Sequence, residues 1–158
     1  MKQIADADAS YLRDQSDIRD LVHRFVKEAD KRSVEGMLGC VSDDVIVSFN
    51  DGALVIDGAE NLRKYMSRQF SHEGTLNPGT RGTHAMCNTI VSLDGDRATA
   101  ETSGVTYLAT ADKKMHIRGV RYFDKFSRID GRWRLVHRQH SCDWQMDATG
   151  YTSPPLLV

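Results

Sequence analysis

Two residues of this sequence have side chains suited to acid–base chemistry: a histidine at position 84 and an aspartate at position 30. A neutral imidazole can take a proton at neutral pH, and a carboxylate bonded to one ring nitrogen orients the other nitrogen as the base. The two residues are more than fifty positions apart. Whether they meet depends on the elements that carry them.

His84 opens a strand pattern that follows a loop rich in Gly and Pro. Asn88 is four positions further on, so regular pleating would place both side chains on one face. Asn88 could then hydrogen-bond a substrate oxygen or satisfy buried backbone groups, and both alternatives stay open. The preceding loop, residues 71–82, has no periodic pattern, and a loop of this length is more often functional or mobile than a neutral linker.

Asp30 falls at the end of a predicted helix. Apolar residues recur at helical spacing between positions 18 and 29, which predicts a helix that starts near residue 16. Asp30 comes four residues after Val26 and therefore projects beside the apolar stripe. The alternative is that Asp30 faces water and pairs with Lys31 or Arg32, which follow it.

The remaining pattern predicts one α+β domain over residues 1–158, with helices before a mainly antiparallel sheet. Further helices are expected at 33–40 and 59–70, and a hairpin at Asp51-Gly52 should join strands 45–49 and 53–56. Four long strands should follow as an antiparallel meander, at residues 83–93, 97–109, 115–128 and 132–144. Such long strands need bulges and strong curvature, so the sheet should bend around the helices and leave a cone with a hollow interior.

The tail, residues 145–158, includes Pro154-Pro155 before three apolar residues. It could cover a pocket mouth, pack on a partner subunit or be loose, and the sequence does not separate these alternatives. The core of the domain is therefore expected at about residues 10–144.

Composition is typical of a globular chain with a real core. Of the 158 residues, 40% are apolar and 27% charged, and 21 Lys and Arg balance 22 Asp and Glu. This balance gives no field that would attract nucleic acid or an anionic membrane, so neither partner is expected. Residues 1–10 are polar, so we expect no signal peptide and no membrane span, and a cytoplasmic protein.

No motif for a bound metal or cofactor is found in the sequence. The three cysteines lack zinc-site spacing, and there is no facial triad, glycine-rich phosphate loop or serine elbow. The simplest expectation is a mechanism without cofactor or metal.

Several motifs together resemble the nuclear-transport-factor-2-like superfamily and, within it, the SnoaL-like group. They cover about residues 10–144 and are Ala29-Asp30-Lys31-Arg32, Val41-Ser42-Asp43-Asp44-Val45, His84-x-x-x-Asn88, Asp94-Gly95-Asp96-Arg97-Ala98, Gly119-x-x-Tyr122-x-Asp124 and Arg128-Ile129-Asp130-Gly131-Arg132-Trp133. The resemblance implies a cone-shaped α+β barrel with a deep apolar pocket for a small ligand, assembled as a homodimer or homotrimer. The superfamily includes dehydratases, dehydrochlorinases, isomerases, polyketide cyclases and members without catalysis, so fold alone does not give function.

In the dehydratase and dehydrochlorinase branches, an aspartate that ends the first helix and a histidine that opens the third strand form a dyad. The resemblance implies these roles for Asp30 and His84. Tyr107 lies near where related dehydratases place another polar pocket residue, which makes it the candidate proton donor. Other candidates for the donor or for substrate contacts are Asn88, His116, Arg121 and Arg138. Ala29 replaces a tyrosine of the fungal dehydratase, so a scytalone-type reaction is not expected.

Two function classes follow. The first is a cofactor-independent lyase or isomerase, in which His84 abstracts a proton from carbon in a small apolar cyclic substrate and water or another leaving group departs. The second is a non-catalytic module that binds a hydrophobic ligand or an enzyme subunit, and a polyketide-cyclase-like enzyme is a further alternative. A separation of more than about 5 Å between Asp30 and His84 would favour the non-catalytic module, because it would leave the base unoriented.

Overall fold

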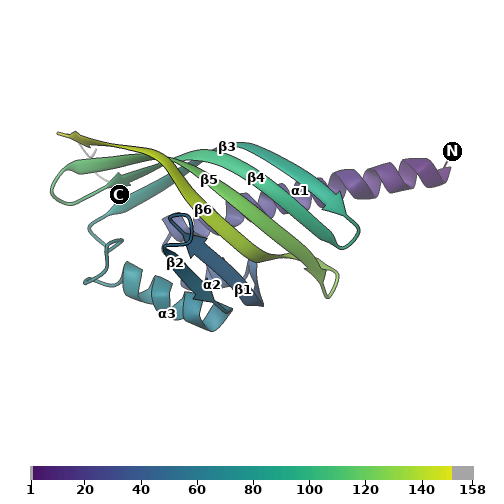
Figure 1. The fold of residues 1–158 in the computed structure, drawn as a ribbon, viewed down its shortest axis with the longest axis horizontal. Coiled ribbons are helices and arrows are strands. Elements are labelled where there is room, and N and C mark those ends of the chain that lie inside the picture. The colour runs from purple at the N-terminus through teal and green to yellow at the C-terminus, as the bar shows by residue number, and fades with distance from the viewer. Residues whose placement is uncertain (1, 151–158) are drawn as a thin grey trace, which may run out of the picture.

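A computed structural model describes residues 2–150, with side chains described from Ala9 onward. The helices are α1 (Lys2–Asp30), α2 (Val34–Leu38) and α3 (Ala59–Phe70). The strands are β1 (Val41–Phe49), β2 (Leu54–Asp57), β3 (Arg81–Asp94), β4 (Arg97–Ala109), β5 (Lys114–Ile129) and β6 (Arg132–Thr149). The predicted α+β class is confirmed, with helices before the long strands (Figure 1).

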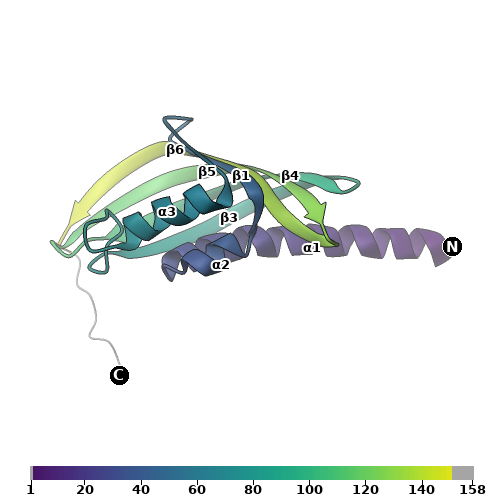
Figure 2. The same ribbon diagram turned by 90° about the horizontal axis from the view of Figure 1, so that it is seen from below.

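The strands form one sheet in the order β2-β1-β6-β5-β4-β3. Neighbouring strands pair antiparallel, except that β1 and β6 run parallel. The last strand of the meander, β6, thus lies beside β1. Strands β2 and β3 are the two edges, so the strongly curved sheet that we expected remains open. It arches over the helices (Figure 2), and its face toward α1 is called here the concave face and the opposite one the convex face.

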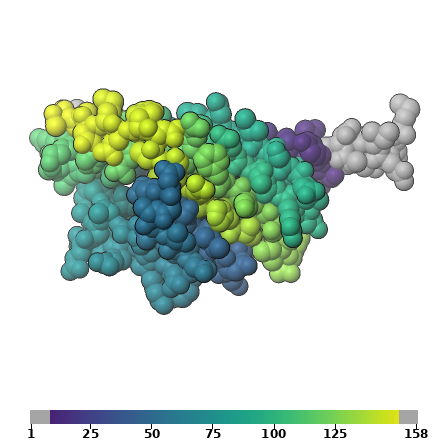
Figure 3. Space-filling model, viewed as in Figure 1, coloured from purple at the N-terminus to yellow at the C-terminus, as the bar shows by residue number. Residues whose placement is uncertain are grey.

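The core lies between the apolar stripe of α1 and the concave face. Ile18 is fully buried, and Val22 and Phe25 are nearly so, which accounts for the helical spacing of the apolar residues. From the sheet, Ala98, Ala100, Phe126 and Leu135 join the same cluster. The β1–β2 hairpin and α3 pack below the long strands (Figure 3).

Helix α1 starts at Lys2, well before the predicted start near residue 16. Apolar periodicity marks only the part of a helix that packs on a core, whereas residues 9–13 of α1, including Tyr11 and Leu12, are exposed. Asp14 ties this half to the sheet, since its carboxylate accepts hydrogen bonds from Arg128 at 2.7 Å and from the indole of Trp133 at 3.0 Å.

Strand β6 continues to Thr149, into the segment that we predicted as a tail. Residues 145–149 pair with the start of β5, so the long meander strands extend beyond their predicted ends. Pro154-Pro155 lies outside the described residues.

Candidate active site on the concave face

The carboxylate of Asp30 contacts His84 at two points. Nδ1 of His84 lies 2.6 Å from Oδ1 of Asp30, and the backbone N–H of His84 donates to Oδ2 at 2.9 Å. Both side chains are about a quarter exposed, at 24% for His84 and 23% for Asp30. Nε2 of His84 has no hydrogen-bond partner among residues 9–150, so this nitrogen is available to a bound molecule.

The cations that follow Asp30 do not pair with it, contrary to the solvent-facing alternative. Nζ of Lys31 contacts Glu28 at 2.7 Å. Arg32 has a positive φ of 57° that turns the chain out of the helix. Its guanidinium donates to the carbonyl oxygens of Leu76 and Asn77, both at 3.0 Å. Arg32 thus ties the loop before β3 to the end of α1, next to the contact between Asp30 and His84.

A cluster of aromatic rings lies on the concave face. The centroid of the His140 ring lies 5.3 Å from the centroid of the Tyr122 ring and 5.9 Å from that of the Phe49 ring. Burial lowers the pKa of His140 to about 4, with contributions from Arg138, His84 and others, so its ring is neutral at pH 7. Burial likewise raises the pKa of Tyr122 to about 12. Sequence reasoning named neither His140 nor Tyr122 as a site residue. The face of the sheet to which a side chain projects depends on the register of its strand, which the sequence does not give.

Arg138 and Asp124 form a buried ion pair beneath these rings. Nε and Nη2 of Arg138 contact the two carboxylate oxygens at 2.8 and 2.7 Å. The guanidinium lies between the rings of Phe25 and Tyr122, at 4.5 and 4.6 Å from their centroids. Burial opposes the charge, but the pairing with Asp124 outweighs it and raises the pKa of Arg138. At 1% exposure, Arg138 lies below the accessible surface, which corrects the expectation that it binds substrate.

Tyr107 and Arg121 lie on the convex face, contrary to expectation. Tyr107 is opposite Thr83 in the β3–β4 ladder, whereas His84 is opposite Thr106, and adjacent residues of a strand face opposite sides. Arg121 is exposed and pairs there with Asp143 at 2.8 Å. Neither side chain therefore shares the face of His84.

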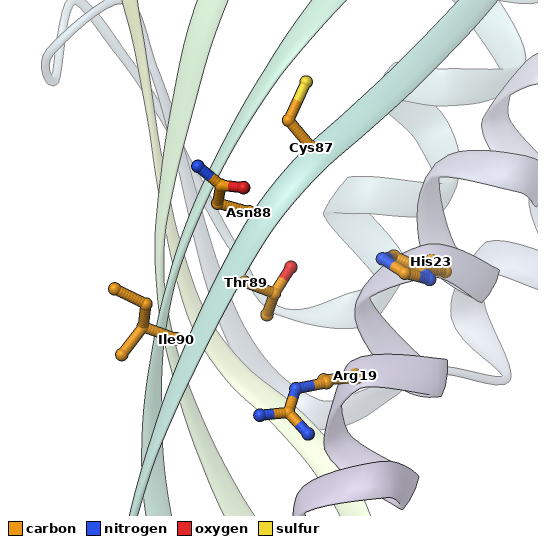
Figure 4. A pocket seen from close by; sticks show the side chains of 6 residues that line it. All are labelled: Arg19, His23, Cys87, Asn88, Thr89 and Ile90. Carbon is orange, nitrogen blue, oxygen red and sulfur yellow. The ribbon is translucent and has the colours of Figure 1, made fainter.

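Asn88 is displaced by a bulge in β3. Met86 pairs with Gly104 and Thr89 with Thr102, so two residues, Cys87 and Asn88, oppose a single residue of β4. The extra residue reverses the alternation, and the expected shared face of Asn88 and His84 is wrong. Asn88 instead lines a hollow between β3 and α1 (Figure 4).

His116 does lie on the concave face. Its cross-strand partners are Gly82, Leu108 and Asp147. This row lies two residues along the strands from the row of His84, so both rows project to the same face. Nδ1 of His116 lies 2.8 Å from Oδ1 of Asp147, and the bonding lowers the pKa of that carboxyl. A second histidine–carboxylate contact is thus present on this face.

The described residues contain no group of three or more His, Cys, Asp or Glu side chains placed to hold a metal ion. None of the helices in the described range has the length and apolar character needed to cross a membrane.

Comparison with known families and structures gives a consistent fold. The model of the SnoaL-like domain matches residues 10–139. No curated protein matches the sequence.

Among solved structures, a single-substitution variant of Rv3472, a protein of unknown function from Mycobacterium tuberculosis, is 28% identical. The match covers 87% of this chain and 75% of that one, with a TM-score of 0.73. A scytalone dehydratase candidate from Novosphingobium aromaticivorans is 16% identical. The match covers 96% of this chain and 98% of that one, with a TM-score of 0.77. Hexachlorocyclohexane dehydrochlorinase LinA-type3 from Novosphingobium barchaimii is 16% identical. The match covers 94% of this chain and 99% of that one, with a TM-score of 0.80. At these low identities the last two matches establish the fold alone.

Proposed function

Since the chain belongs to the SnoaL-like domain family and holds an oriented histidine on its concave face, we propose that it is a cofactor-independent lyase or isomerase. The substrate is a small, largely apolar cyclic compound. The observation that carries the proposal is the double contact of Asp30 with the ring and the backbone of His84. The structural likeness to a dehydrochlorinase and a dehydratase candidate supports the same class of reaction.

In this proposal Nε2 of His84 removes a proton from a carbon next to an activating group. Asp30 holds the proton on Nδ1 and stabilises the imidazolium that forms. The electron pair of the broken C–H bond then forms a double bond as halide leaves, or as a hydroxyl group leaves and takes the proton from the imidazolium of His84 to become water. In an isomerisation the same proton returns at another carbon. An oriented base of this kind contributes about 10²–10⁴-fold to the rate.

The test is turnover of a panel of hydroxylated and halogenated cyclic compounds, followed by halide release and by detection of the unsaturated product. The wild type should convert at least one class, and His84→Ala should lose about 10²-fold or more of that rate. His23→Ala is the matched control, because His23 is exposed on α1. Equal rates for wild type and His84→Ala would remove His84 from the mechanism.

A second candidate is a non-catalytic module that assembles with itself, and it rests on the convex face. Tyr107, Trp144 and Met146 are exposed there by 38%, 49% and 54%, and exposed apolar patches often mark contacts between proteins. We propose this face as the contact in a homodimer or homotrimer. Light scattering on wild type and Trp144→Ser measures assembly. A stable oligomer without turnover of any compound in the panel would favour the module over the enzyme.

A further inference from the structure

Arg118 lies in the same cross-strand row as His84. His84 is opposite Thr106 on β4, and Thr106 is opposite Arg118 on β5. Directly opposed residues project to one face of a sheet, so Arg118 shares the concave face with His84. Two strand spacings, about 10 Å, separate the two backbones. Long side chains reaching from both sides can therefore hold a small ring between them.

Hydrogen bonds orient the guanidinium of Arg118. Its Nε donates to Oε1 of Gln145 at 2.9 Å, and Nε2 of Gln145 donates to Oδ1 of Asp147 at 3.3 Å. Nδ1 of His116 contacts the same oxygen at 2.8 Å. Arg118 is thus held by a neutral amide, and its two Nη groups have no hydrogen-bond partner within the part of the chain that the structure describes.

Two other arginines on β5 and β6 are each paired with a carboxylate, which Arg118 is not. Arg121 is paired with Asp143 on the convex face, and Arg138 is paired with Asp124 in the core. Both guanidinium groups have a carboxylate as direct partner. Arg118 instead presents its charged donors to the face where His84 presents its free nitrogen.

We propose that Arg118 binds the oxygen of a carbonyl group in the substrate while His84 takes a proton from the adjacent carbon. This inference rests on the proposed function and names its substrate class, a cyclic ketone with a hydrogen on the α-carbon. The C–H bond breaks, its proton goes to Nε2 of His84, the C–H electron pair becomes a C=C bond, and the π pair of the carbonyl group moves onto its oxygen. The enolate charge then lies against the Nη groups, where charge-assisted hydrogen bonds are strong. As the C=O bond re-forms, the enolate either expels a leaving group from the β-carbon or takes the proton back from the imidazolium of His84 at another carbon.

The experiment uses 2-tetralone, a bicyclic ketone, in D₂O, with exchange of its α-hydrogens followed by NMR. Wild type should accelerate exchange over buffer, and Arg118→Met should lower the rate about 10–100-fold, since one lost oxyanion donor in an enclosed site costs up to about 10³-fold. Arg121→Met is the matched control, three positions away on the opposite face, and should stay within about twofold of wild type. Binding of 2-naphthol, a stable mimic of the enolate, should weaken about tenfold in Arg118→Met, whereas binding of naphthalene should not change.

His84→Ala separates this inference from the proposed function. If His84→Ala loses exchange while Arg118→Met matches Arg121→Met, the role of Arg118 is wrong and the base stands. If wild type exchanges no better than buffer, the carbonyl class is wrong, and the halogenated and hydroxylated panel decides on the proposed function. Gln145→Leu, which removes the acceptor that orients Arg118, provides a second variant if Arg118→Met does not fold. Its exchange rate should also fall, and a wild-type rate would contradict the inference.

Discussion

Replacement of Asp124 by Asn should destabilise the fold by about 3–5 kcal/mol. The substitution leaves the guanidinium of Arg138 buried without its counter-charge, and breaking a buried pair costs far more than losing a surface pair. Counted over the side-chain atoms alone, Arg138 is 2% exposed and Asp124 is 0% exposed, so water cannot replace the carboxylate. For a chain of this size, such a loss lowers the unfolding temperature by about 10 °C.

The assay is urea unfolding at pH 7, followed by tryptophan fluorescence and circular dichroism. Asp143→Asn is the matched control, because Asp143 pairs with Arg121 at the surface and should lose less than about 1 kcal/mol. The double variant Asp124→Leu with Arg138→Met should regain part of the stability, since an apolar pair can replace a buried ion pair. Equal losses for Asp124→Asn and Asp143→Asn would refute the reasoning.

Two further predictions concern pH and the loop before β3. The pKa of His140 is lowered to about 4 in the folded chain, whereas an unfolded chain has the ordinary value of about 6.5. Between these two pH values the unfolded chain therefore binds a proton that the folded chain does not. The free energy of unfolding should fall by at most about 3 kcal/mol as pH drops from 6.5 to 4. His140→Gln should remove this part of the pH dependence, and an unchanged profile would contradict the burial of a neutral ring. Arg32→Ala removes the hydrogen bonds to the carbonyls of Leu76 and Asn77, so hydrogen exchange of residues 74–80 should quicken about tenfold or more by mass spectrometry. Lys31→Ala, which touches only the surface pair with Glu28, should leave that exchange unchanged.

Much of the fold could be predicted because local patterns determine it. Helix α3 has the predicted bounds, Ala59–Phe70, and the meander strands lie where turn residues separate the predicted runs. The contact between Asp30 and His84 is present as well. It was expected from the resemblance of the motifs, since the local sequence alone favoured an Asp30 that faces water and pairs with its neighbours.

The facing of the other candidate residues could not be predicted because it depends on register. The bulge at Cys87 and Asn88 has no glycine or proline to mark it, yet it reverses the faces of the β3 residues that follow it. Tyr107 was placed by analogy with related dehydratases, and the ladder puts it opposite Thr83 instead of His84. His140 was missed for the same reason, since its neighbours on the concave face come from other strands.

The ring of His84 offers the most direct test of the central claim, that Asp30 holds it as a base with Nε2 free. Two-bond ¹H–¹⁵N correlation NMR at neutral pH reports which ring nitrogen carries the proton. We predict a proton on Nδ1 and an unprotonated Nε2 in wild type, with this preference lost in Asp30→Asn. A proton on Nε2 of wild-type His84, or a tautomer unchanged by Asp30→Asn, would contradict the account.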